Sequence, residues 1–119
     1  MEESFHWEHV KFGLKPTLRA NHVIVYRPSE PADASIVVVD KQLYASHYFQ
    51  VAVDFWVCVK DSANPEAEGF YLITEKGSRQ HGLTGFRGSI IRGTAVGRAR
   101  SSIEKGLATL KQELEARAK

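Results

Sequence analysis

Several side chains capable of acid–base chemistry lie in and around the middle of the sequence. Tyr44, His47 and Tyr48 are close together, Asp54 follows within the next ten residues, and His81 comes later. A histidine beside a carboxylate can accept and return a proton during a reaction. These residues favour one interpretation, a small enzyme with an acid–base pocket built from His47, Asp54 and His81. The other interpretation is that these side chains face solvent or a partner.

A second candidate site is rich in glycine and arginine. Between Gly77 and Ile103 the sequence contains neither Asp nor Glu, and seven of the nine glycines fall between Gly77 and Gly106. Glycine-rich backbone can turn N–H groups towards an anion, and arginine offers paired donors to phosphate or carboxylate. We therefore predict a ligand site from Arg79, Arg87, Arg92, Trp56 and Tyr48. The alternatives are solvated or glutamate-paired arginines and a tryptophan packed in a core or interface.

Metal and thiol chemistry find little support. His6 and His9 are three residues apart, whereas two histidine ligands on one helix face are usually four apart and on one strand face two apart. Cys58 is the single cysteine, so the chain has no internal disulfide, and no neighbouring base marks it as a nucleophile. We expect neither a metal nor a cofactor.

Composition indicates one ordinary globular domain over residues 1–119. Apolar residues make up 43% and charged residues 25%, and the formal net charge is only +2. So small an excess does not indicate nucleic-acid binding, for which only Phe86 lies beside the arginines as a stacking group. The N-terminus carries Glu2, Glu3 and Glu8 rather than a signal sequence, and no apolar stretch is long enough to span a membrane. We expect a cytoplasmic protein without membrane contact.

Four strands are predicted, over residues 21–27, 35–41, 48–60 and 70–75. The third shows a two-residue period typical of a strand with one face on a core, and it is long enough to require a bend or a bulge. Its apolar positions are all odd-numbered: Phe49, Val51, Val53, Phe55, Val57 and Val59. Short connections favour antiparallel pairing. The segment containing Phe5 and Trp7 is predicted as a strand or a short helix.

One amphipathic helix is predicted to begin between Thr94 and Ser101 and to end near Lys119. Gly106 inside it indicates close packing on the sheet. The fold is therefore α+β, an antiparallel sheet of four to five strands with one long C-terminal helix packed on one face. The helix would contribute a stripe of apolar residues at steps of three and four, opposite the odd-numbered strand residues: Val96, Ala99, Ile103, Leu107, Leu110 and Leu114.

One helix is too narrow to cover such a sheet. Four strands span nearly 20 Å, about twice the diameter of a helix with its side chains. The remaining apolar surface needs another cover, and three alternatives are open: the aromatic N-terminal segment, a second copy of the chain, or an apolar ligand. We favour a non-enzymatic domain that forms a homodimer through its apolar sheet surface and binds a small lipophilic or anionic ligand.

The order of a curved antiparallel sheet and a long C-terminal helix, over about residues 21–119, resembles the START-like, helix-grip group. That resemblance implies a lipophilic ligand held between sheet and helix. The same order resembles small α+β barrels that close their sheet by dimerising. The stretch Gly77-Ser-Arg79-Gln-His81-Gly-Leu83, with Phe86-Arg-Gly88 after it, is similar to the tails of uncharacterised bacterial proteins, which implies a bacterial origin and no function.

Overall fold

A computed structural model describes residues 1–12, 15–29, 35–61, 63, 69–80 and 85–117, with backbone alone for residues 12 and 85–91. The chain divides into two compact units, Met1–His81 and Gly82–Lys119. The first contains the strands and the second the helix, which is the α+β arrangement that the sequence predicts. His81 and the side chain of Arg87, both named as candidate site residues, lie outside the described part of the chain.

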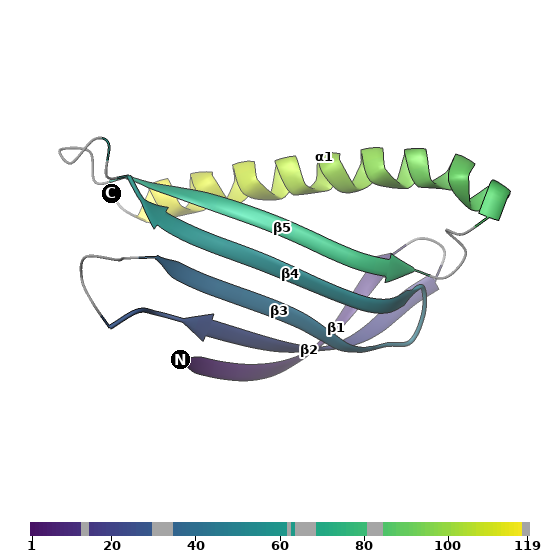
Figure 1. The fold of residues 1–119 in the computed structure, drawn as a ribbon, viewed down its shortest axis with the longest axis horizontal. Helices are drawn as coiled ribbons and strands as arrows, with labels where there is room; N and C mark the ends of the chain where they lie inside the picture. The colour runs from purple at the N-terminus through teal and green to yellow at the C-terminus, as the bar shows by residue number, and fades with distance from the viewer. Residues whose placement is uncertain (13–14, 30–34, 62, 64–68, 81–84, 118–119) are drawn as a thin grey trace. The chain divides into compact units, whose positions relative to one another are not determined.

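The first unit is a five-stranded antiparallel sheet in which every strand pairs with its neighbours in sequence (Figure 1). Short connections join consecutive strands, so neighbours in sequence become neighbours in space. The order is β1-β2-β3-β4-β5, which leaves β1 and β5 as the two edges. The strands are β1 (Glu2–Phe12), β2 (Lys15–Tyr26), β3 (Ile36–Ala45), β4 (Phe49–Lys60) and β5 (Phe70–Gln80).

The N-terminal segment forms an edge strand. All of β1 pairs with β2, from Glu2 opposite Val25 to Phe12 opposite Lys15. Of the two alternatives for this segment, the strand is therefore correct. Because β1 continues the sheet sideways, it does not form a separate layer over a sheet face. This counts against the N-terminal segment, one of the three alternatives for the cover of the sheet.

The bend or bulge expected in the long strand occurs at the start of β4. Phe49 pairs with Gln80 and Val51 pairs with Arg79, so Gln50 is the extra residue. One inserted residue reverses the alternation of faces. Phe49 therefore lies on the face opposite to Val51, and the prediction that all six odd-numbered apolar residues share one face is wrong for Phe49 alone.

The helix α1 (Gly85–Arg117) begins well before the predicted interval between Thr94 and Ser101. Its early glycines each lower helix propensity by about 1 kcal/mol relative to alanine. Once a helix is nucleated, however, each further residue adds a hydrogen bond, and the costly first turn is formed only once. The well-patterned C-terminal half can therefore extend the helix backwards through a glycine-rich segment.

The close packing of Gly106 on the sheet, which the sequence predicts, stays a prediction. A Cβ atom built on Gly106 would have no heavy atom of the described residues within 4 Å, leaving aside its chain neighbours and the nearby helix backbone. The same is true of Gly97. Each of these glycines lowers the helix propensity of α1 relative to alanine.

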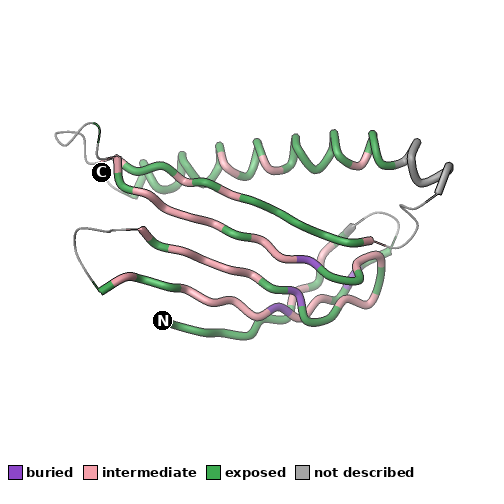
Figure 2. The backbone as a smooth tube through the Cα atoms, viewed as in Figure 1, coloured by how far each residue is buried: buried purple, intermediate pink, exposed green. Residues whose placement is uncertain are grey.

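The odd-numbered face of β4 carries large exposed side chains. Val51 is 48% exposed and Phe55 is 39% exposed, whereas Ala52 on the other face is the buried apolar residue of the described chain. Most of the backbone in Figure 2 is intermediate or exposed. Long strands place apolar groups on both faces of the sheet, so periodicity alone identifies an apolar face without showing that anything covers it.

Candidate functional site

The strand registers sort the side chains of the sheet into two faces. Residues directly opposite each other on antiparallel strands point to the same side. Val39 is opposite Phe55, and one position further along each strand Asp40 is opposite Asp54. The first pair belongs to an exposed apolar surface and the second to a group of polar side chains on the reverse side.

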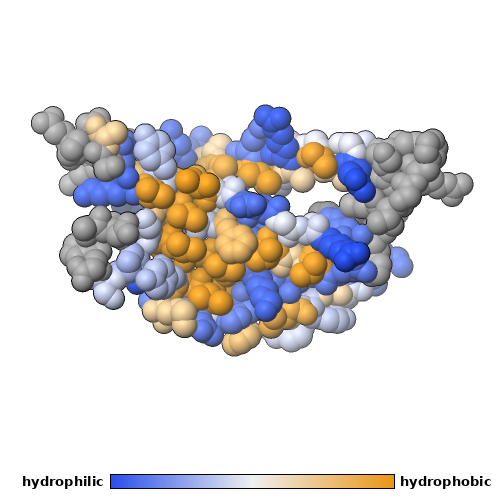
Figure 3. All heavy atoms as spheres, in the orientation of Figure 1, coloured by the Kyte–Doolittle hydropathy of each residue, from blue (hydrophilic) through white to orange (hydrophobic). Residues whose placement is uncertain are grey.

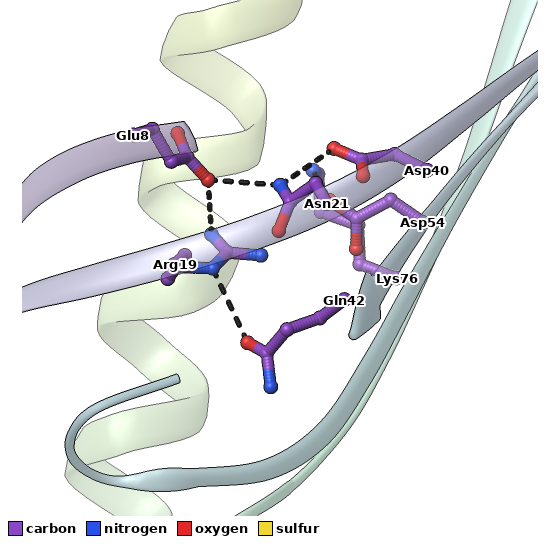
Figure 4. Close-up of polar contacts among 7 residues, drawn as sticks. All are labelled: Glu8, Arg19, Asn21, Asp40, Gln42, Asp54 and Lys76. Carbon is purple, nitrogen blue, oxygen red and sulfur yellow. Dashed lines mark hydrogen bonds and ion pairs between the residues drawn. The ribbon is translucent and has the colours of Figure 1, made fainter. Parts of the chain in front are cut away.

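Seven side chains on this reverse side form the polar cluster, with every strand contributing at least one (Figure 4). A second bulge lies beside it. Ala20 pairs with Tyr44 and Asn21 pairs with Gln42, so Leu43 is the extra residue on β3. The members of the polar cluster are Glu8, Arg19, Asn21, Asp40, Gln42, Asp54 and Lys76.

Arg19 connects the first three strands of the polar cluster. A terminal guanidinium nitrogen lies 3.1 Å from a carboxylate oxygen of Glu8, and Nε donates to Oε1 of Gln42 over 3.2 Å. The guanidinium carbon also lies 5.6 Å from the centre of the Phe49 ring, within the range of a cation–π contact. This contact agrees with the reversed face of Phe49 that follows from the bulge.

Asn21 is almost fully buried, with 4% of its surface exposed. Its amide nitrogen donates to Glu8 over 2.9 Å and to Asp40 over 3.2 Å. Its amide oxygen is buried and accepts no hydrogen bond from the described residues, and the same holds for Oδ1 of Asp40. Asn21 therefore bridges the carboxylates of Glu8 and Asp40 through its amide nitrogen.

Asp40, Asp54 and Lys76 form one row across β3, β4 and β5. Asp40 is directly opposite Asp54, which is directly opposite Lys76, and the Lys76 ammonium is paired with the Asp54 carboxylate. Burial raises the pKa of Asp40; Arg19 opposes this, and the nearby Asp54 carboxylate adds to it. A carboxyl with a raised pKa beside a second carboxylate can hold a proton and pass it on, which is the chemistry of a general acid.

The predicted acid–base residues are not all brought together. Asp54 lies within the polar cluster, whereas His47 lies in the connection between β3 and β4, and its ring meets that of Tyr48 edge to face. Within β4, the five residue steps from Phe49 to Asp54 alone cover roughly 15 Å, so Asp54 lies well along the strand from the turn that holds His47. Asp40 is therefore better placed than His47 to act with Asp54.

The predicted ligand-binding residues also lie apart. Trp56 is half-buried on the side of the polar cluster, with the Lys76 ammonium 4.6 Å from its ring centre, but Arg79 is exposed on the opposite face. Tyr48 accepts a hydrogen bond from the backbone N–H of Lys15 over 2.9 Å. Arg92 is an exposed residue of α1. The register thus places Trp56 and Arg79 on different faces of the sheet.

The apolar face is the surface of the sheet opposite to the polar cluster. Its residues form rows that cross the strands, such as Tyr26, Val37, Val57 and Ile73. Figure 3 shows hydrophobic side chains gathered on this side over β3 and β4. We define the apolar face by its described apolar members: Phe5, Trp7, Leu18, Ala20, Ile24, Tyr26, Val37, Val39, Val51, Val53, Phe55, Val57, Val59, Tyr71 and Ile73.

Large side chains on the apolar face are well exposed. Trp7 is 69%, Tyr71 60% and Ile73 57% exposed. At the β1 edge, the Phe5 ring stacks on the His22 ring with centres 4.5 Å apart. A contiguous surface of exposed aromatic and branched residues is unusual on a monomer.

Sequence reasoning missed most of the polar cluster. Arg19, Asn21 and Gln42 received no functional interpretation, although Arg19 and Asn21 alternate within a strand and so share a face. That alternation was a readable signal. Gln42 shares a face with Asp40 by the same alternation, whereas the pairing that brings β2 and β3 together cannot be read from either strand.

No family model, curated protein or solved structure matches this chain. Among the described residues, no helix is long and apolar enough to cross a membrane. In the same part of the chain, no group of three or more His, Cys, Asp or Glu side chains is placed to hold a metal ion. The apolar face and the polar cluster are the two features that bear on function.

Proposed function

We propose that this chain is a non-enzymatic association domain that forms a homodimer through the apolar face. The observation that carries the proposal is the exposure of large apolar side chains across all five strands, from Trp7 on β1 to Ile73 on β5. Burying such a surface removes about 25 cal/mol of unfavourable hydration per Å². Removal of apolar surface from water therefore supplies the driving force for association.

A second copy of the chain is a suitable cover because the face is broad and apolar. A dimer with two-fold symmetry uses the same patch on both protomers, so that patch must be complementary to itself. Two sheets can stack face to face about 10 Å apart with their inner side chains interdigitating. The central strand of such an interface would be β4, where Val51, Val53 and Phe55 alternate on the apolar face.

Light scattering on the purified protein, combined with size exclusion, tests the dimer. We expect a mass near twice the 13.3 kDa of one chain. Phe55→Glu places a charge in the centre of the apolar face and should give a monomer, whereas Ser78→Glu, on the polar-cluster side of β5, should leave the dimer intact. Circular dichroism verifies that each variant is folded.

Ile73→Lys provides a second interface variant if Phe55→Glu fails to fold, because Ile73 is more exposed in the single chain. A wild-type mass of one chain at high protein concentration would overturn the proposal. So would a folded Phe55→Glu or Ile73→Lys variant that dimerises as strongly as the wild type.

The small ligand is the second part of this proposal. Trp56, half-buried beside the Lys76 ammonium, offers a surface on which an apolar or anionic group can rest. Native mass spectrometry of the freshly purified protein should show a bound species that denaturation releases. If the native and denatured masses differ only by the number of chains, this part of the proposal fails and the dimer stands.

A small enzyme is the second candidate function, and the Asp40–Asp54 pair favours it. Burial raises the pKa of Asp40, which prepares its carboxyl to donate a proton, while Asp54 stays paired with Lys76. Chromogenic esters and glycosides test for hydrolysis. Activity abolished by Asp40→Asn and retained in Glu113→Gln, an exposed carboxyl on α1, would support the enzyme. Equal background rates for the wild type, Asp40→Asn and Glu113→Gln would exclude hydrolysis of these substrates.

A further inference from the structure

The buried side chains of the sheet lie on the side of the polar cluster. Asn21 is directly opposite Gln42, and Thr17 and Ala52 reach the same side through the two-residue period of β2 and β4. These are the most buried of the described residues: Thr17 is 0%, Asn21 4%, Gln42 5% and Ala52 7% exposed. Three of the four are polar. The sheet therefore buries polar groups on one face and leaves the apolar face exposed.

Two oxygen atoms of the polar cluster are buried acceptors that receive no hydrogen bond from the described residues: Oδ1 of Asn21 and Oδ1 of Asp40. Asn21 lies at the centre of the polar cluster, with Glu8 and Arg19 on one side and Asp40 and Asp54 on the other (Figure 4). Its amide nitrogen donates to Asp40 over 3.2 Å, so the two oxygens belong to neighbouring side chains. Because buried polar groups are normally hydrogen-bonded, this pair of acceptors suits a ligand that donates.

Asp40 is also the carboxylate of the polar cluster that has no ion pair among the described residues. Arg19 is paired with Glu8, and Lys76 is paired with Asp54. These two pairs account for both basic side chains of the polar cluster and for two of its three carboxylates. When Asp40 is ionised, its negative charge is therefore left over.

The other basic side chains that the strands place on this face do not balance that charge. His6 is hydrogen-bonded to Ser4. Lys15 and Lys60 lie at the ends of their strands, at least six residues from the row that contains Asp40, which is roughly 20 Å or more along the strand. The surroundings of Asp40 in the sheet thus favour a positively charged ligand.

We propose that Asp40 and Asn21 bind a small organic cation with N–H donors, such as a primary ammonium group. The nitrogen donates to Oδ1 of Asp40 and to Oδ1 of Asn21, and its charge balances the Asp40 carboxylate. Hydrogen bonds assisted by charge in this way are stronger than neutral ones. A cation without N–H groups would leave both acceptors unpaired, and an anion would be repelled by the carboxylate. The site is on the face opposite to the proposed dimer interface and does not depend on the dimer.

Side chains at the rim of the polar cluster give access to this site. The Glu8 side chain is 38% exposed and the Lys76 side chain 35%, whereas those of Arg19 and Asp54 are 20% and 22% exposed. Glu8 and Lys76 have long side chains with several rotamers. Rotation of either side chain opens a path from solvent to the two buried oxygens.

Binding should strengthen as the pH rises through the pKa of Asp40. Burial raises this pKa; Arg19 lowers it, and Asp54 and Glu8 add to the rise. Lys76, on β5, is paired with Asp54. Because the cation binds the ionised carboxylate, protonation of Asp40 at lower pH competes with binding. Asp40→Asn keeps the size of the side chain but removes its charge, and should remove this pH dependence.

Titration with n-butylammonium chloride at constant ionic strength tests the site, with the side-chain amide signals of Asn21 followed by heteronuclear NMR. We expect a saturable shift of these signals, and little shift with tetramethylammonium chloride, which carries the same charge but no N–H donor. Asp40→Asn should weaken butylammonium binding at least roughly tenfold, because it removes the charge-assisted contact. Glu75→Gln removes an exposed carboxylate from the apolar face of the same sheet and should leave the dissociation constant unchanged.

Asn21 signals that stay unshifted by butylammonium in the folded wild type would overturn this inference. Equal shifts with tetramethylammonium would overturn it too, because they would reflect charge alone, and so would an unchanged butylammonium affinity in Asp40→Asn. Light scattering of the same samples reports the dimer separately. A monomer that binds butylammonium would remove the proposed dimer and support this site.

Discussion

Asp40 and Asp54 are direct cross-strand neighbours on the polar side of the sheet, so two carboxyl groups share one row. Like charges at directly opposite positions destabilise a sheet. Lys76 pairs with Asp54, and Asn21 donates to Asp40. The negative charge of Asp54 is therefore balanced by an ammonium group, whereas that of Asp40 is met only by a neutral amide within this row. Substitution of Asp40 is for this reason the sharper test of how the two carboxyl groups affect stability.

We predict that ionisation of Asp40 lowers the stability of the fold. Burial raises the pKa of Asp40 above its ordinary value of 3.8. The folded chain therefore holds its proton more tightly than the unfolded chain, and the free energy of unfolding falls as the pH rises from about 3.8 to the raised pKa. Above that range the loss is complete and this group adds no further pH dependence.

Asp40→Asn tests this effect, because its amide oxygen can still accept the hydrogen bond from Asn21. Urea unfolding at pH values from acid to neutral should show a smaller fall in stability with rising pH for this variant than for the wild type. Glu113→Gln should follow the wild-type curve. Parallel curves for Asp40→Asn and the wild type would contradict the prediction.

Arg19 should be the most sensitive member of the polar cluster. Arg19→Met keeps an apolar stem but removes the guanidinium that pairs with Glu8 and donates to Gln42, and we expect a loss of about 1–3 kcal/mol in the free energy of unfolding. Arg19→Lys should lower the free energy of unfolding by less, because lysine keeps the positive charge although it cannot contact Glu8 and Gln42 at the same time. Arg100→Met, which breaks an exposed pair with Glu104 on α1, should cost less than about 0.5 kcal/mol in the same urea titration.

Alanine at the helix glycines should stabilise the chain. Gly97→Ala and Gly106→Ala should each raise the free energy of unfolding by about 0.5–1 kcal/mol, because alanine has the higher helix propensity and an added Cβ meets no close neighbour. Thermal and urea unfolding followed by circular dichroism measure the change. A destabilised Gly106→Ala variant would instead support the close packing at Gly106 that the sequence indicates.

Cys58 should react slowly with thiol reagents. Burial raises the pKa of its thiol, which lowers the thiolate fraction at neutral pH, and the side chain is only partly accessible. With a chromogenic disulfide we expect a rate at least roughly tenfold below that of an exposed cysteine, such as Ser102→Cys in a Cys58→Ala background. The rate at Cys58 should keep rising above the pH at which the comparison thiol levels off. Equal rates would contradict the prediction.

The sequence by itself determined the α+β class, the antiparallel order and the long strand β4. These features follow from local rules: a two-residue period in Val51, Val53 and Phe55 requires a strand, and short connections place consecutive strands side by side. The same periodicity identified the apolar face. The C-terminal end of α1 near Arg117 was also accessible, because its apolar stripe has a helical period.

The tertiary structure alone decided which side chains meet and which surface is covered. A bulge at Gln50 moves Phe49 across the sheet to Arg19, and a bulge at Leu43 turns Tyr44 to the apolar face. Both depend on hydrogen bonds between strands, and residues on one strand do not report its register against another. Exposure of the apolar face is likewise a property of three-dimensional packing, because periodicity marks an apolar side of a strand without showing what covers it.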